Sequence, residues 1–232
     1  MELLIDSADL SKIERLYDIY PIDGVTTNPS ILAESGRRPY EVLRDIRSII
    51  GEDAQLHVQV ISVDASSIVD EAHRILDKLP GNTLIKIPAI PEGIKAIRIL
   101  SHASVPVTAT VIYSPMQALL AAKAGASYAA PYVNRIENLG LDAIECVRTM
   151  QKMIISDGLK TKILGASFKN SFQVISLMQI GAEAITLSPS VLSQLLENKY
   201  VDMAVDNFIS DFEALCGKGS SMLTESFDSG RS

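Results

Sequence analysis

The sequence predicts an α/β fold, a single (β/α)8 TIM barrel with an extra helix at its C-terminal end. Short apolar runs rich in β-branched residues alternate with segments of helical periodicity along the chain, and eight such units can be counted. The 232 residues allow about 29 per unit, a usual length for one βα repeat. Eight parallel strands joined by right-handed crossovers can close into a barrel, which leaves no edge strand to protect.

The expected strands are, in chain order, residues 2–5, 24–27, 55–61, 83–87, 105–112, 127–133, 162–166 and 184–187. Helices are expected where a capping residue precedes apolar positions three and four residues apart. They are residues 9–17, 39–50, 64–76, 92–102, 115–124, 141–155, 171–180 and 190–197, followed by the extra helix at 201–215.

The helix expected at 64–76 illustrates the pattern. Asp64 is a favourable N-cap, and the chain turns at Pro80 and Gly81 soon after the last apolar position. The apolar stripe consists of Ile68, Ala72, Ile75 and Leu76. Such a stripe is typical of a helix with one face packed on a sheet.

We expect one catalytic barrel domain at 1–216 and a flexible tail at 217–232. The tail reads GKGSSMLTESFDSGRS and is rich in Gly and Ser, so it would be flexible or rest as an arm on a neighbouring subunit. An open doubly wound sheet is the alternative fold. It is disfavoured because no G-x-G-x-x-G follows the first strand, as a dinucleotide site requires.

Composition excludes several classes of protein. With 47% hydrophobic and 21% charged residues and only two cysteines, the chain is neither disordered nor a disulfide scaffold. The net charge of −7 argues against binding nucleic acid or an anionic membrane by bulk charge. A small-molecule partner fits this balance better.

The sequence also indicates a cytoplasmic location. The start, MELLIDSADL, lacks the basic region of a secretory signal, and no apolar run is long enough to span a membrane. Cys146 and Cys216 are far apart in the sequence and match no metal or redox spacing.

Polar residues recur where the expected strands end. In a barrel of this kind, catalytic groups come from the carboxyl ends of the strands and the loops after them. The residues in these places are Asp6, Thr26, Thr27, Asn28, Gln59, Lys86, Thr110, Tyr132, Asn134, Arg135 and Ser167. Because so many converge on one rim, we expect the active site there.

Lys86 is the candidate nucleophile. It lies between Ile85 and Ile87 in an apolar strand, so alternation puts its amine on the opposite face from these isoleucines. If the isoleucines pack on the helices, the amine points into the barrel, where burial favours the neutral form that a Schiff base requires. The alternative is a lysine that extends from a strand end to water.

Neighbouring polar residues have weaker individual signals. Asp6 would transfer protons beside Lys86, although it could instead cap the following helix. Gln59 and Thr110 would position a water molecule, although polar residues in barrels also serve as hydrogen-bonded filling. His57 shares the face of Gln59 and is expected to pack in the interior. The histidines form no metal-binding pattern.

Arg135 and Ser167 would hold an anion. A guanidinium gives a bidentate contact, and a hydroxyl with nearby amides completes the site. They follow the sixth and seventh strands, near the usual phosphate site of such barrels. A surface pair between Arg135 and Glu137 is the alternative.

Four motifs together point to a family: GVTTNPS at 24–30, IKIP at 85–88, APYVNRI at 130–136 and ASFK at 166–169. With them the chain resembles the transaldolase family, and within it the short-chain branch that contains fructose-6-phosphate aldolase. The likeness covers roughly positions 1–215, essentially the whole barrel.

The resemblance implies class I aldolase chemistry without a metal or cofactor. Lys86 would form an iminium with a ketose phosphate such as fructose 6-phosphate, and Asp6 would handle protons. Cleavage would release an aldehyde such as glyceraldehyde 3-phosphate and leave a dihydroxyacetone enamine on Lys86. The family's transaldolases of this size usually carry Glu and Phe at two positions where this chain has Gln59 and Tyr132. Gln and Tyr at these positions are the pair typical of the aldolases.

The resemblance also implies binding residues and an assembly. Thr27 and Asn28 match positions that contact the three-carbon unit, and Arg135 and Ser167 match the phosphate site. Asn134 is also expected to bind the substrate. A homo-oligomer is expected, a decamer or pentamer. Three alternatives stay open: transfer of dihydroxyacetone to a second sugar phosphate, a sulfonate in place of the phosphate, and a barrel that binds a sugar phosphate or a protein without catalysis.

Overall fold

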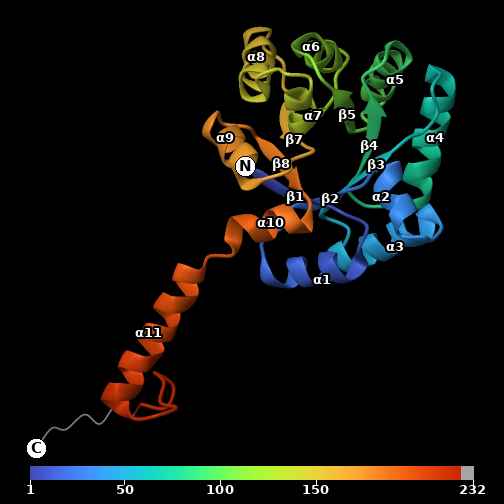
Figure 1. Cartoon of the computed structure of the whole chain (residues 1–232). Coiled ribbons are helices and arrows are strands. Elements are labelled where there is room, and N and C mark those ends of the chain that lie inside the picture. Colours follow the sequence, from blue (N-terminus) through green and yellow to red (C-terminus); the bar gives the residue numbers. More distant parts are fainter. Residues whose placement is uncertain (226–232) are drawn as a thin grey trace, which may run out of the picture. The chain divides into compact units, whose positions relative to one another are not determined.

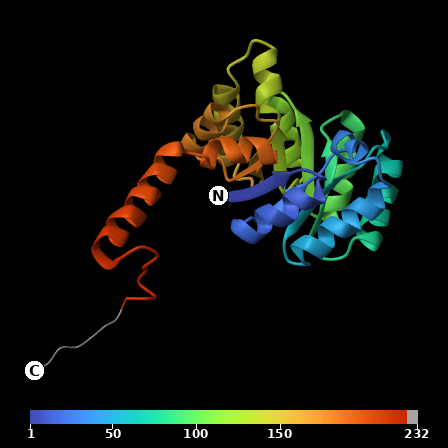
Figure 2. The same ribbon diagram turned by 60° about the horizontal axis from the view of Figure 1, so that its bottom comes forward.

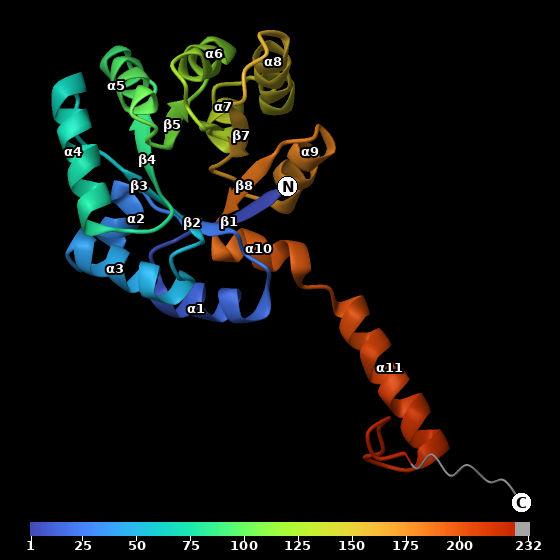
Figure 3. The same ribbon diagram turned by 180° about the vertical axis from the view of Figure 1, so that it is seen from behind.

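The computed structural model describes residues 1–225, which divide into two compact units, Met1–Leu195 and a second that starts at Leu196. The first unit is a closed barrel whose eight parallel strands pair in chain order, with β8 returning to β1. Helices surround the strands in the opposite views of Figures 1 and 3. The chain enters the barrel directly through β1, as Figure 2 shows. The predicted (β/α)8 barrel is confirmed.

All eight expected strands are present. They are β1 Glu2–Asp6, β2 Gly24–Thr26, β3 Gln55–Gln59, β4 Thr83–Pro88, β5 Val107–Ile112, β6 Tyr128–Pro131, β7 Lys162–Gly165 and β8 Ala184–Leu187. The third strand ends two residues before the expected Ile61. The reason is that the Glu71 carboxylate accepts hydrogen bonds from the backbone N–H groups of Ile61 and Ser62, which turns the chain out of the sheet.

The helices of the barrel unit are α1 Leu10–Ile19, α2 Pro29–Glu34, α3 Pro39–Ile50, α4 Ala65–Lys78, α5 Pro91–His102, α6 Pro115–Lys123, α7 Val133–Asn138, α8 Ala143–Ser156, α9 Ser171–Gln179 and α10 Pro189–Leu196. The short helices α2 and α7 were not expected. The α2 helix begins with Asn28 as N-cap and Pro29 in its first turn. The α7 helix begins at Val133, which the sequence had assigned to the sixth strand, and its N-cap makes no side-chain bond. No helix within residues 1–225 is long and apolar enough to cross a membrane.

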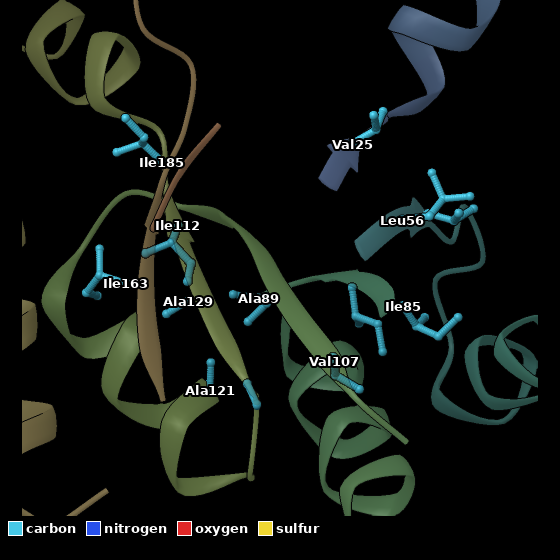
Figure 4. Close-up of a cluster of buried hydrophobic side chains, with 14 of the residues drawn as sticks. Val25, Leu56, Ile85, Ala89, Val107, Ile112, Ala121, Ala129, Ile163 and Ile185 are labelled. Atoms are coloured by element: carbon cyan, nitrogen blue, oxygen red, sulfur yellow. The ribbon is translucent and has the colours of Figure 1, made fainter. Parts of the chain in front are cut away.

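Alternation along the strands sends every second side chain outward. Outward residues from successive strands pack with the helices into the main core, as Figure 4 shows for Val25, Leu56, Ile85, Val107, Ala129, Ile163 and Ile185. A second, smaller cluster consists of Leu4, Leu84, Tyr128, Ala130, Leu164 and Ala184, from the alternate strand positions that face the lumen. Ile85 and Ile87 are fully buried in the outer core. Lys86, between them, therefore lies on the lumen side, as predicted.

Polar contacts join β1, β6 and β7 at the amino ends of the strands. The Glu2 carboxylate accepts hydrogen bonds from the Tyr128 hydroxyl at 2.6 Å and from the Lys162 ammonium at 2.5 Å. These bonds tie the first strand to the sixth and seventh, opposite the rim from which the loops of a barrel build a site.

The second unit contains α11, Lys199–Cys216, the expected extra helix. It begins after the N-cap Asn198, and none of its residues is buried. By contacts the chain divides after Leu195, whereas we expected the domain boundary at residue 216. A flexible tail at 217–232 stays a prediction: residues 217–225 form turns, and 226–232 lie outside the described residues.

Candidate active site

An open cavity of about 1230 Å³ lies at the carboxyl ends of the strands, and each of the eight strands, or the loop after it, contributes to its wall. Seven of the eleven polar residues predicted at the rim line this cavity: Asp6, Asn28, Gln59, Lys86, Tyr132, Arg135 and Ser167. The other four, Thr26, Thr27, Thr110 and Asn134, are not part of its lining. The structure therefore brings most of the predicted residues into one place.

Lys86 extends from β4 into the floor of the cavity. Its side chain is buried, and the Nζ atom donates a hydrogen bond to the carbonyl oxygen of Thr27 at 2.7 Å. Burial lowers the pKa of the Lys86 ammonium, and the Asp6 carboxylate opposes this effect. A buried amine held by one carbonyl, with a lowered pKa, is suited to act as a neutral nucleophile.

Asp6, at the end of β1, faces the same cavity. Its Oδ1 atom accepts a hydrogen bond from the Thr26 hydroxyl at 2.7 Å, and that hydroxyl lies 2.7 Å from the hydroxyl of Thr186. Burial raises the pKa of the Asp6 carboxyl, whereas the Lys86 ammonium and the Thr26 hydroxyl lower it. Thr186 was not among the predicted residues. Its position late in β8 is the signal that could have found it.

Gln59, at the end of β3, has a buried Oε1 atom without a hydrogen-bond partner among residues 1–225. The residue lines the cavity, and its strand neighbour in register is Lys86. A buried acceptor without a partner costs stability, so this atom favours a donor in the cavity.

Thr110 and Tyr132 form a hydrogen-bonded pair beside the cavity. The Thr110 hydroxyl is buried and donates to the Tyr132 hydroxyl at 3.1 Å. Burial raises the pKa of Tyr132, while Thr110 and Arg135 lower it. Thr110 therefore contacts Tyr132, which lines the cavity, and does not line the cavity itself. The Tyr132 hydroxyl stays protonated at neutral pH.

Cations without carboxylate partners lie at one end of the cavity. Arg135 and Lys169 both line it, and neither forms an ion pair within residues 1–225. Arg135 therefore does not make the pair with Glu137 that was the alternative for it. Ser167 also lines the cavity and has φ 60°, an unusual left-handed conformation for a serine. Lys169 was missed in the sequence, although it ends the ASFK motif.

The cations on the other side of the cavity are already paired. Lys12 lies 2.9 Å from a carboxylate oxygen of Asp9, and Arg37 lies 2.8 Å from one of Asp45. Free positive charge in the cavity wall is thus concentrated beside β6 and β7. An elongated ligand with one anionic end would be oriented by this difference.

Three predicted binding residues have other contacts. Thr27 is fully buried, and its hydroxyl donates to the carbonyl oxygen of His57 at 3.0 Å, so its side chain holds β2 to β3. The Asn134 Oδ1 atom accepts a hydrogen bond from Gln173 at 3.2 Å, outside the cavity. The Asn28 Oδ1 atom caps α2, and this side chain does line the cavity.

His57 packs in the lumen, as expected. It is fully buried, and its ring nitrogens lie 2.9 Å from the side chains of Gln55 and Thr108. Burial lowers the pKa of His57 to about 3, and the Lys86 charge acts in the same direction. The ring is therefore neutral and does not transfer protons near pH 7. Within residues 1–225, no group of three His, Cys, Asp or Glu side chains could hold a metal ion.

One comparison decides the family. A family model described as Transaldolase/Fructose-6-phosphate aldolase matches residues 3–230. The chain belongs to this family. It is therefore an enzyme of the aldolase or transaldolase type, and the cavity at the barrel rim, with Lys86 and Asp6 in its wall, is the candidate active site of this family member.

If Arg135 binds the substrate's anion, as the sequence predicts, Arg135→Ala should lower kcat/KM for phosphorylated substrates roughly ten- to a hundredfold, because one charge-assisted contact is lost. Arg135 is exposed, so screening puts the effect toward the lower end of this range. Steady-state kinetics with glyceraldehyde 3-phosphate and unphosphorylated glyceraldehyde check this expectation. Equal losses for both aldehydes would remove Arg135 from the anion site.

Proposed function

We propose that the enzyme is a class I aldolase that cleaves or forms a ketose phosphate such as fructose 6-phosphate, with Lys86 as the Schiff-base residue. The observation that carries the proposal is the buried Lys86 amine, which has Thr27 as its hydrogen-bond partner within residues 1–225 and opens into the cavity. A lysine on the surface would be protonated near pH 7 and unable to attack a carbonyl.

The proposed reaction begins with attack of the neutral Lys86 amine on the ketose carbonyl carbon. Loss of water gives an iminium, which withdraws the electron pair of the neighbouring carbon–carbon bond as that bond breaks. A base removes the proton from the hydroxyl that becomes the aldehyde, and glyceraldehyde 3-phosphate leaves. The remaining enamine is protonated at carbon, and water then hydrolyses the iminium to release dihydroxyacetone.

Proton transfer is proposed for Asp6 and for a water molecule held by Tyr132 and Thr110. Burial raises the pKa of Asp6, which favours a carboxyl able to give as well as take a proton. The Thr110–Tyr132 pair has a hydroxyl at the cavity wall that can bind water. Arg135, Ser167 and Lys169 would bind the substrate's terminal phosphate or a sulfonate in its place, because the unpaired cations lie at this end.

A transaldolase is the second candidate, since the family includes both activities. The two differ in how the enamine on Lys86 is discharged: protonation gives an aldolase, whereas capture by a second aldose phosphate gives a transaldolase. Two residues support the aldolase. The hydroxyl of Tyr132, paired with Thr110, can bind a water molecule for protonation of the enamine. Gln59 is neutral and adds no further carboxylate beside it.

A product assay distinguishes the two candidates. Fructose 6-phosphate is incubated with the enzyme, with and without erythrose 4-phosphate, and free dihydroxyacetone and sedoheptulose 7-phosphate are measured. An aldolase releases dihydroxyacetone in both mixtures. A wild-type enzyme that forms only the transfer product would overturn the aldolase proposal but keep the role of Lys86.

Gln59→Glu should shift the ratio of the two products toward transfer by about tenfold. A carboxylate at this half-buried position in the cavity wall would interact with Asp6 and the iminium, and coupling of one pKa unit corresponds to a factor of ten. The product ratio at fixed acceptor concentration is the measurement. Tyr132→Phe, which removes the hydroxyl from the water-binding pair, should move the ratio in the same direction. An unchanged ratio in both variants would exclude this pair from the partition.

We also propose that the enzyme is a cytoplasmic homo-oligomer, a decamer or pentamer, on the basis of the family resemblance. Light scattering of the purified protein measures the number of subunits.

A further inference from the structure

Strand β5 contains a bulge beside the cavity. Ala109 pairs with Ala129 of β6, but Ile112 pairs with Pro131, so β5 has one more residue than β6 between these pairs. Val111, within the bulge, has φ 60°. A β-branched residue rarely adopts this left-handed conformation, because its side chain strains the backbone there. Such strain persists where the surrounding structure requires it.

The bulge changes which side chains face the cavity. In a regular strand, Ile112 would face the same side as Thr110, and the next residue would face the helices. Here Val111 lines the cavity, and Ile112 is fully buried in the outer core. Tyr113 follows the bulge and packs against the outer core, and it contacts Arg135 and Tyr132, which line the cavity.

Tyr113 holds the guanidinium of Arg135. Arg135 Nη1 donates to the Tyr113 hydroxyl at 3.2 Å, the one hydrogen bond of this guanidinium within residues 1–225. The Arg135 Cζ atom also lies 4.8 Å from the centre of the Tyr132 ring, and the two tyrosine rings meet edge to face with centroids 5.8 Å apart. Both contacts restrict a side chain that is otherwise exposed.

The position of Tyr113 is itself fixed from α6. Its backbone N–H donates to the Gln117 side chain at 2.9 Å, and Gln117 belongs to the capping box that starts this helix. The contacts thus run from the helix cap through Tyr113 to Arg135. A guanidinium held in place before the ligand arrives loses less conformational entropy on binding.

We propose that Tyr113, which follows the bulge at Val111, is a positioning residue whose hydroxyl orients Arg135 for the substrate's anion. This inference rests on the proposed function, since it assumes that Arg135 binds that anion. It predicts different roles for the two neighbouring tyrosines. The hydroxyl of Tyr113 orients Arg135 for anion binding, and the hydroxyl of Tyr132 binds the water molecule that transfers protons.

Tyr113→Phe tests the proposal, because phenylalanine keeps the ring contacts and removes only the hydroxyl. The Kd of inorganic phosphate, measured by calorimetry, should rise about three- to tenfold, as should KM for glyceraldehyde 3-phosphate. The kcat values and the kinetics with unphosphorylated glyceraldehyde should stay unchanged. Tyr132→Phe should leave the phosphate Kd unchanged and alter the product ratio instead.

Tyr17→Phe is the matched control, because the Tyr17 hydroxyl is buried, has no partner within residues 1–225 and does not line the cavity. A phosphate Kd that is unchanged in Tyr113→Phe, or that rises equally in Tyr17→Phe, would overturn the proposal. Trapping of dihydroxyacetone on Lys86 with borohydride is measured in the same samples. Normal trapping with an unchanged phosphate Kd overturns the role of Tyr113 alone, whereas absent trapping in the wild type overturns the proposed function.

Discussion

Lys86→Met should lower kcat by at least about 10⁴-fold, because no other group can form the covalent intermediate that divides the reaction into two easier steps. Methionine is unbranched and fills most of the volume of the lysine stem in the lumen, so the barrel should still fold. The measurements are the rate of fructose 6-phosphate cleavage and the mass of the protein after borohydride treatment with dihydroxyacetone. The wild type should gain an adduct at Lys86 and the variant should gain none.

Lys123→Met is the matched control for this substitution. Lys123 is exposed and pairs with Asp157, so it lacks the burial that prepares Lys86. Its replacement should leave both cleavage and adduct formation unchanged. If Lys86→Met kept full activity and trapped the adduct on another lysine, Lys86 would not be the nucleophile.

The pH dependence of trapping follows from the same burial. Because burial lowers the pKa of Lys86 in the folded protein, its neutral form is present at lower pH than in an ordinary lysine of pKa 10.5. The trapping rate should therefore rise with pH and reach its plateau at a lower pH than it would for an exposed lysine. After unfolding, the lysine would return to its ordinary range.

The position of Lys86 could be predicted from sequence because alternation in a strand depends only on counting residues. Ile85 and Ile87 mark the outward face, and the intervening side chain must then face the lumen. Counting does not hold through β5, because the bulge adds a residue between Ala109 and Ile112. Valine has a high strand propensity, and nothing in the residues around Val111 indicates a positive φ, so the bulge could not be foreseen.

Local hydrogen bonds account for the other differences. The second strand ends at Thr26, one residue before the expected end, and the hydroxyl of Thr27 donates to the His57 carbonyl. Asn134 contacts Gln173 because α7 starts directly after β6. The sequence contains a signal for α2, since Asn28 and Pro29 suit an N-cap and a first turn. It contains none for α7, whose first residue is a β-branched valine. A side chain's final partner depends on such three-dimensional neighbours and not on strand position alone.

Asp6→Asn should lower kcat by roughly 10²- to 10³-fold and yet leave an adduct on Lys86, because the nucleophile stays and the proton-transferring group is lost. Asparagine has nearly the same shape and can still contact the Thr26 hydroxyl, so the change removes the charge and the exchangeable proton. The measurements are turnover, borohydride trapping of dihydroxyacetone, and the pH dependence of the trapping rate.

The direction in which the pH dependence of trapping shifts follows from the interaction between Asp6 and Lys86. The Asp6 carboxylate raises the pKa of Lys86 against the lowering by burial, so its removal should lower the pKa of Lys86 further and move the acid limb of trapping to lower pH. Thr26→Val is the matched variant. It removes the hydroxyl that lowers the pKa of Asp6, so the carboxyl should stay protonated up to a higher pH. Over that pH range the neutral Asp6 does not raise the pKa of Lys86. If Asp6→Asn lost trapping and turnover to the same extent, Asp6 would be needed for formation of the iminium and not only for the later proton transfers.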